Sequence, residues 1–287
     1  MKLANLAGRL AIVTDDRAID VATASRGVFD ADPQAIYARW SEFTTWATDA
    51  DFSAGSHFDP TDLQAAVPAP RQFFAIGLNY RDHAEETNTP LPPAPMVFTK
   101  FQSAIAGPRV DIPIVSDTVD YEAEMCVVIS QGGRNIDAAD AMAHVAGIAI
   151  GQDISDRGTQ LAGPAPQFSL GKSHAGYAPV GPWLVTLDEV GSIDNLAIRT
   201  EVRRAGRQNL ETLQNGNTSD LIFSVPELIA YLSRFVEMLP GDVIMTGTPA
   251  GVAMAGGRYL EVGDVLVTSI EGVGSMESRC VSPGCAS

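Results

Sequence analysis

The chain has 287 residues, enough for one large core with a small appended domain, and its 19 basic and 35 acidic residues give a formal net charge of −16. No basic stripe offsets this charge, no run approaches the roughly 18 apolar residues of a membrane helix, and the first residues do not resemble a signal peptide. We therefore expect no nucleic-acid partner, no membrane partner and a cytoplasmic location. Three cysteines are too few and too irregularly spaced for a disulfide framework or a zinc site, which fits a reducing compartment.

The first 66 residues predict a small N-terminal domain. Two short apolar runs, residues 10–13 and 19–22, precede a helix that is expected over residues 33–47, with Asp32 as its N-cap. A proline-marked linker over residues 59–71 then leads into the rest of the chain.

Residues 67–287 predict a second domain that is rich in strands. Strand-like runs alternate with glycine and proline turns, at residues 73–76, 96–100, 124–129, 183–186, 196–203, 242–246 and 265–270. Two helices are expected, at residues 138–146 and at residues 225–239, the second with a capping box formed by Ser224 and Glu227. Because strands outnumber helices and do not alternate with them strictly, we expect a β-rich α/β fold and not a doubly wound parallel sheet.

Glu122 and Glu124 lie two residues apart in a run that otherwise reads as a buried strand, residues 121–129. A period of two would place both carboxylates on one face, with Ala123 and Met125 facing the core. Burying either carboxylate without a partner costs several kcal/mol, and a divalent cation would remove that cost. The alternative is an edge strand with a solvated acidic face.

Asp153 ends the apolar run at residues 147–152 and offers a third oxygen ligand. Three carboxylates without cysteines or paired histidines indicate a hard divalent cation, Mg²⁺, Mn²⁺ or Ca²⁺. Arg157 and Gln160 follow Asp153 by four and seven residues, so a helical turn would keep both on one face near the carboxylates.

His83 and Glu86 are three residues apart in an expected helical turn, so their side chains are neighbours. A carboxylate beside an imidazole fixes its tautomer and raises its basicity, which suits a general base for water. The alternative is an exposed histidine with a chance acidic neighbour. Lys172 follows a glycine turn, and a simply solvated lysine is the alternative to a functional one.

Six motifs, in their order and spacing, resemble those of the fumarylacetoacetate hydrolase family. They cover residues 70–275 and read GLNYRDHAEE, DYEAE, GQDISDRGTQ, LGKS followed by APVGPW, NGNTSDLIFSVPELIAYLS and LPGDVIMTGTPAGV. The resemblance implies a mixed β-sheet roll with a few helices, a bound Mg²⁺ or Mn²⁺, and a homodimer. The sequence departs from the family pattern at Gln152, at His174-Ala175-Gly176 and in a long insert at residues 208–214, which leaves the substrate open.

Carried over by motif, the resemblance assigns four roles to site residues. It implies metal ligation by Glu122, Glu124 and Asp153, and water activation by a pair formed by His83 and Glu86. It implies anion stabilisation by Lys172, and substrate contacts from Tyr80, Arg157, Gln160 and Thr248.

We therefore expect a metal-dependent hydrolase that cleaves a carbon–carbon bond in an acylpyruvate or a related 2,4-dioxo acid. Octahedral Mg²⁺ held by three carboxylates leaves about three positions for a 2-oxo acid and water, and the ion would act as an electron sink. Alternatives are a decarboxylase of oxaloacetate-like acids or an isomerase of unsaturated 2-oxo acids on the same metal, and a non-catalytic protein with a structural ion. Residues 85–95 are polar and proline-rich, so we expect a lid that orders when substrate binds.

Overall fold

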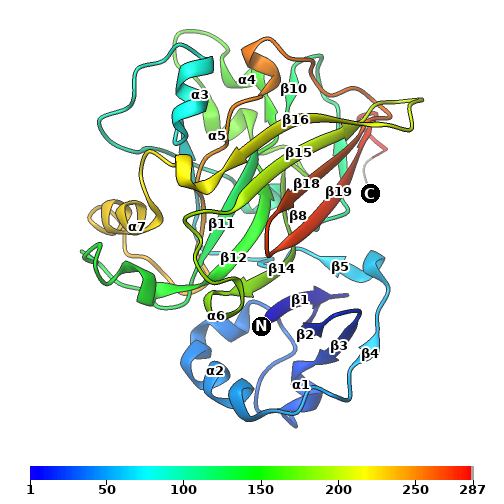
Figure 1. Ribbon diagram of the computed structural model, residues 1–287, viewed down its shortest axis with the longest axis vertical. Helices are drawn as coiled ribbons and strands as arrows, with labels where there is room; N and C mark the ends of the chain where they lie inside the picture. The colour runs from blue at the N-terminus through cyan, green and yellow to red at the C-terminus, as the bar shows by residue number, and fades with distance from the viewer. Residues whose placement is uncertain (286–287) are drawn as a thin grey trace.

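Runs of β-branched and aromatic residues form two large sheets in the computed structural model, which describes residues 1–285 (Figure 1). The main sheet has 12 strands, the second has 5, and a pair of short strands lies apart from both. Helices are few and short, and they lie at the margins of the sheets. The prediction of a β-rich α/β fold with mixed sheets is confirmed.

The N-terminal residues add their strands to one end of the main sheet. β1 pairs with β14 of the rest of the chain, and Leu3 and Phe43 share one buried core with Val128. The elements here are β1 (Lys2–Leu6), β2 (Arg9–Thr14), β3 (Arg17–Asp20), α1 (Val21–Ala24), η1 (Ala35–Arg39), α2 (Trp40–Asp49), β4 (Ser56–His57), η2 (Pro60–Asp62) and β5 (Leu63–Gln64). The helix expected over residues 33–47 is divided into η1 and α2, and Asp32 accepts a hydrogen bond from Gln34 N without capping α2. A domain boundary after residue 66 stays a prediction.

The centre of the main sheet is an antiparallel pair, β11 (Ala123–Ile129) and β12 (Val145–Gln152), whose residues are all buried. Met125 and Val127 pack in one core while Cys126 and Val128 pack in another, because alternate residues face opposite sides of the sheet. The predicted placement of Ala123 and Met125 in the core is confirmed. The other strands of this part are β6 (Phe73–Gly77), β7 (Met96–Thr99), β8 (Ile105–Ala106), β14 (Ala178–Thr186) and β17 (Val243–Met245).

The second sheet crosses in front of the first in Figure 1. Its strands are β9 (Asp111–Pro113), β15 (Ala197–Arg203), β16 (Leu210–Asn217), β18 (Val265–Ile270) and β19 (Gly274–Val281). The insert at residues 208–214 is therefore largely the first part of β16. The separate pair consists of β10 (Val119–Asp120) and β13 (Ser155–Asp156), which flank the metal-ligand candidates in the sequence.

Two predicted helices differ from the structure. The helix expected at residues 138–146 is wrong: only the 3₁₀ turn η4 (Ala141–His144) forms, because the β-branched run from Val145 onward belongs to β12. The helix expected at residues 225–239 ends early, as α7 (Val225–Ser233), and leaves Phe235 exposed. Its capping box between Ser224 and Glu227 is confirmed.

The remaining short helices connect the strands around the sheets. They are α3 (Arg81–Glu86), η3 (Gln102–Ala104), α4 (Arg157–Gln160), α5 (Phe168–Gly171), α6 (Leu187–Val190), η5 (Thr218–Asp220) and η6 (Ala253–Ala255). Among residues 1–285, no helix combines the length and the apolar character that crossing a membrane requires.

Candidate metal centre and adjoining cavity

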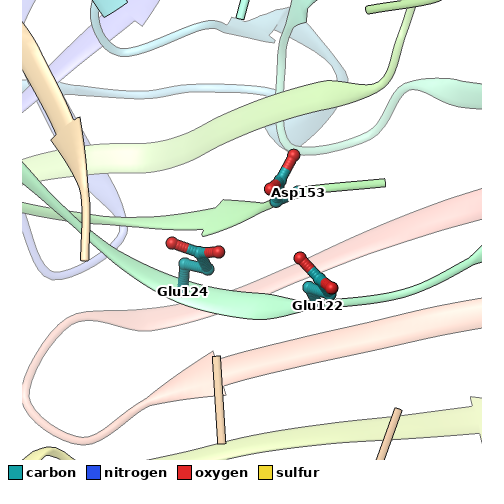
Figure 2. Close-up of side chains that lie close together, drawn as sticks. All are labelled: Glu122, Glu124 and Asp153. Atoms are coloured by element: carbon teal, nitrogen blue, oxygen red, sulfur yellow. The ribbon is translucent and has the colours of Figure 1, made fainter. Parts of the chain in front are cut away.

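Glu122, Glu124 and Asp153 meet where β11 begins and β12 ends (Figure 2). The two strands are antiparallel, so Glu122, just before β11, lies beside Asp153, just after β12, and Asp153 N donates to Glu122 O over 2.9 Å. One carboxylate oxygen from each residue lies within 4.8 Å of the others, and all three residues are buried. The three candidate ligands are therefore brought together.

Three buried cations pair with two of these carboxylates. Lys172 Nζ lies 2.5 Å from Glu122 Oε2 and 2.6 Å from Asp153 Oδ2. Arg157 Nη2 donates to Glu122 Oε1 over 2.6 Å, and Lys100 Nζ donates to Asp153 Oδ1 over 2.6 Å. Lys172 is thus not the solvated lysine that was the alternative.

Glu124 is the carboxylate without a cation. Within residues 1–285 it forms no ion pair, and its Oε2 accepts a hydrogen bond from Gly247 N over 2.6 Å. Burial, Asp153 and Glu122 together raise its pKa well above the ordinary value of a glutamate. Lys172 and Arg157 have the opposite effect on Glu122, whose pKa is lowered although burial opposes the shift.

The charge balance of the cluster favours a bound divalent cation. Arg157 also pairs with Asp120, so four buried carboxylates face the three cations Lys100, Arg157 and Lys172. The cluster therefore has one carboxylate more than it has cations, and among the described residues Glu124 is the one without a cationic partner. Three carboxylate oxygens are the donor set that Mg²⁺ and Mn²⁺ prefer, so the residues present fit such an ion.

His83 and Glu86 form a pair on α3, as expected. His83 Nδ1 lies 2.6 Å from Glu86 Oε1, and Glu86 Oε2 accepts a hydrogen bond from Gly251 N over 2.9 Å. A carboxylate beside Nδ1 favours the tautomer with the hydrogen on Nδ1, and in that tautomer Nε2 can accept a proton. His83 and Glu86 are already paired in this structure. The predicted lid therefore does not have to close for the pair to form.

A cavity of about 270 Å³ adjoins the carboxylates and contains most of the predicted site residues. Its wall includes Glu122, Glu124, His83, Lys172, Arg157, Gln160 and Thr248, and the segment predicted as a lid contributes Thr87, Thr89 and Pro92. The predicted helical turn is confirmed as α4, in which Arg157 Nη1 donates to Gln160 Oε1 over 2.8 Å.

Two features of the sequence lie away from the cavity wall. Tyr80 is fully buried and is not among the residues that line the cavity, and its backbone bridges to Leu221. The unusual His174-Ala175-Gly176 does not line the cavity either, and the His174 ring lies against Tyr177 instead. The departure from the family pattern at residues 174–176 therefore does not shape this cavity, and a substrate contact from Tyr80 stays a prediction.

Sequence reasoning missed two supports of the cluster. One is Lys100, which pairs with Asp153. Its position at the end of an apolar strand could have indicated a buried lysine with a carboxylate partner. The other is a buried amide: Gln152 Oε1 accepts a hydrogen bond from Glu122 N over 2.9 Å, and Gln152 Nε2 donates to Thr268 over 2.8 Å. Gln152 thus anchors the backbone of a candidate ligand to the second sheet.

Replacing Lys100 by methionine should lower the free energy of unfolding by about 3 kcal/mol or more, because it breaks a buried ion pair. Lys100 Nζ also donates to the carbonyl oxygens of Ile154 and Tyr177, which would lose their donor. Urea unfolding with a chelator measures the loss. As a matched control, Lys2→Met removes an amine 5.4 Å from the Trp183 ring and should cost less than about 1 kcal/mol. Equal losses in the two variants would contradict this account of Lys100.

Comparisons with known proteins agree with the geometry. The family model described as fumarylacetoacetate (FAA) hydrolase C-terminal matches residues 72–281. Human mitochondrial oxaloacetate tautomerase FAHD2A is 42% identical over 221 residues, which are 76% of this chain and 68% of that protein. A Mycobacterium smegmatis crystal structure described as HpcE is 48% identical, with a TM-score of 0.92, over 99% of this chain and 100% of that one. Fumarylpyruvate hydrolase from Pseudomonas aeruginosa, in complex with Mn²⁺ and pyruvate, is 31% identical, with a TM-score of 0.65, over 74% and 90% of the chains.

Proposed function

Because the chain belongs to the fumarylacetoacetate hydrolase family, we propose that it is a Mg²⁺- or Mn²⁺-dependent hydrolase of an acylpyruvate or a related 2,4-dioxo acid. It would break a carbon–carbon bond and release pyruvate and a carboxylic acid. One observation carries this choice: His83, which is paired with Glu86 at 2.6 Å, lines the same cavity as Glu122 and Glu124 of the three clustered carboxylates. The hydrolase from Pseudomonas aeruginosa, with Mn²⁺ and pyruvate, supports the assignment of both ion and product.

His83 and Glu86 would activate the water. His83 Nε2 accepts a proton from water as the water attacks the distal carbonyl carbon, and Glu86 stabilises the resulting imidazolium through Nδ1. The same imidazolium can then return the proton to the pyruvate fragment as it leaves. A histidine in this role contributes about 10²- to 10⁴-fold in rate.

The cluster would bind the 2-oxo acid end and offset its charge. A divalent cation held by Glu122, Glu124 and Asp153 would supply Lewis-acid polarisation of the keto group. Lys172 and Arg157 lie beside the same carboxylates and would stabilise negative charge that develops on the substrate. Gln160 and Thr248 would supply neutral hydrogen bonds from the cavity wall.

Proton transfer without hydrolysis is the second candidate. The 42% identity to the human oxaloacetate tautomerase favours it, since a tautomerase needs a base beside a 2-oxo acid but no attacking water. His83 could move a proton between carbon and oxygen of an enol in the same cavity. Isomerisation of an unsaturated 2-oxo acid or decarboxylation of an oxaloacetate-like acid would use the same groups.

A substrate panel distinguishes the candidates. Purified protein with Mg²⁺ or Mn²⁺ is offered acylpyruvates, oxaloacetate and unsaturated 2-oxo acids, while enol absorbance is followed and products are identified by mass spectrometry. We expect pyruvate and the matching carboxylic acid in equal amounts from an acylpyruvate. Unchanged acylpyruvate together with faster keto–enol exchange of oxaloacetate would favour the tautomerase instead.

The proposal includes a homodimer in the cytoplasm and a small 2-oxo acid as the binding partner. The dimer is what the family resemblance implies. Sedimentation velocity at micromolar concentration tests it, and a species of about 30 kDa would contradict it.

A further inference from the structure

The wall of the cavity beside the carboxylate cluster combines two chemically different sets of side chains. One set is charged and belongs to the cluster and its partners, whereas most of the other wall residues are apolar, among them Ile76, Leu78, Met96, Phe98, Phe168 and Met254. The two sets adjoin at Phe98, whose ring centroid lies 5.0 Å from Lys172 Nζ and 5.5 Å from the Phe168 ring centroid. A ligand held at the carboxylate cluster would therefore also contact aromatic and thioether side chains.

The cations of the cavity wall are already engaged. Within the described residues, Arg157, Lys172 and the imidazole of His83 are the wall groups that can carry positive charge. Arg157 donates through Nε, Nη1 and Nη2 to Asp120, Gln160 and Glu122. Lys172 bridges Glu122 and Asp153, and His83 faces Glu86. Each of these groups already has a carboxylate partner, so a second ligand carboxylate against the apolar side chains would lose its hydration without gaining an ion pair.

We propose that the cavity selects 2-oxo acids whose distal substituent is apolar and uncharged, such as acylpyruvates with a short alkyl or aryl group, over dicarboxylic 2-oxo acids. The selection rests on the proposed function, because it takes the 2-oxo acid end to lie at the carboxylate cluster. A volume of about 270 Å³ is at the lower end for small-molecule sites, which limits the distal group to a few carbons beyond the dioxo unit.

Met96 is the position at which this selectivity can be changed. It lies opposite Gly77 in the β6–β7 pair, and a Cβ added at Gly77 would collide with Met96 Cε, so the Met96 side chain covers the glycine in the cavity wall. Val97 is the next residue of the same edge strand, is similarly exposed and does not line the cavity, because alternate side chains face opposite sides. Met96→Lys and Val97→Lys therefore add the same charge inside and outside the cavity.

Calorimetric titration of the Mg²⁺-loaded protein with 2-oxohexanoate and 2-oxoadipate tests the proposal without any turnover. Both ligands have six carbons, and the second differs by a distal carboxylate. We expect 2-oxohexanoate to bind at least about tenfold more tightly. Met96→Lys should reduce this preference by about tenfold or reverse it, and Val97→Lys should leave it within about twofold.

Three results would overturn the proposal, and they are distinguishable. Equal or tighter binding of 2-oxoadipate by the wild-type protein refutes the apolar selectivity and leaves the proposed function standing. Equal effects of Met96→Lys and Val97→Lys would attribute the preference to the net charge of −16 and not to the cavity wall. Binding of neither ligand in the presence of Mg²⁺ would refute the 2-oxo acid site itself, and the proposed function with it.

Discussion

Glu124→Gln should abolish turnover and weaken Mn²⁺ binding by more than about 100-fold, while the metal-free protein keeps its stability. The wild-type side chain is buried with no ion pair among residues 1–285, and its raised pKa favours the neutral acid in the metal-free protein, so the isosteric amide breaks no salt bridge. Gly247 N can still donate to the amide oxygen. Isothermal titration with Mn²⁺, and urea unfolding with a chelator, measure the two effects separately.

Asp153→Asn is the matched control, because it removes another candidate ligand but should also destabilise the metal-free protein. Asp153 pairs with Lys100 and Lys172, and its loss leaves two buried ammonium groups short of a partner, at a cost of about 3–5 kcal/mol. Both variants should lose the ion, yet only Asp153→Asn should unfold at a lower urea concentration than the wild-type protein. Full Mn²⁺ affinity in Glu124→Gln would contradict the placement of the metal, and a large loss of stability in that variant would contradict the charge argument.

His83→Ala should lower kcat for an acylpyruvate by about 10²- to 10⁴-fold while leaving Mn²⁺ affinity unchanged. The imidazole lines the cavity and is paired with Glu86, but it is not among the clustered carboxylates that would hold the ion. Glu86→Gln should lower kcat less, because the amide can still contact Nδ1 but stabilises the imidazolium poorly. Steady-state kinetics, with Mn²⁺ titration of each variant, separates the proton-transfer role from a role in metal binding.

His144→Ala is the control for loss of a histidine. His144 is half-buried, with Nδ1 2.8 Å from Gln131 O, and it does not line the cavity, so kcat should stay within about twofold of wild type. Unchanged turnover in His83→Ala would remove His83 from the reaction. A loss in His83→Ala that is confined to oxaloacetate tautomerisation would favour the second candidate function.

The sequence predicted those strands and candidate metal ligands whose pattern is contained within a few neighbouring residues. The two-residue spacing of Glu122 and Glu124 reflects the period of β11, and the run that ends at Asp153 is β12. The spacing of Arg157 and Gln160 likewise reflects one turn of α4. In each case the backbone geometry follows directly from neighbouring residues.

The predictions failed where contacts between elements far apart in the sequence determine the local structure. Residues 138–146 have a helical pattern, but pairing with β11 draws Val145 and the residues after it into a strand. Lys100 was missed because its partner, Asp153, lies 53 residues away in the sequence. Tyr80 belongs to the same motif as His83, yet its side chain is buried and its backbone bridges to Leu221, more than 100 residues away in the sequence. Contacts of this kind are set by packing between distant elements and leave no local period.

Cleavage of an apolar acylpyruvate in H₂¹⁸O, with Mg²⁺ present, tests the central claim most directly. If His83 activates water for attack on the distal carbonyl, pyruvate and the carboxylic acid should form in equal amounts, and the acid should gain an ¹⁸O atom from solvent. Glu124→Gln should give neither product. Complete recovery of the acylpyruvate with the wild-type protein would contradict the hydrolase assignment.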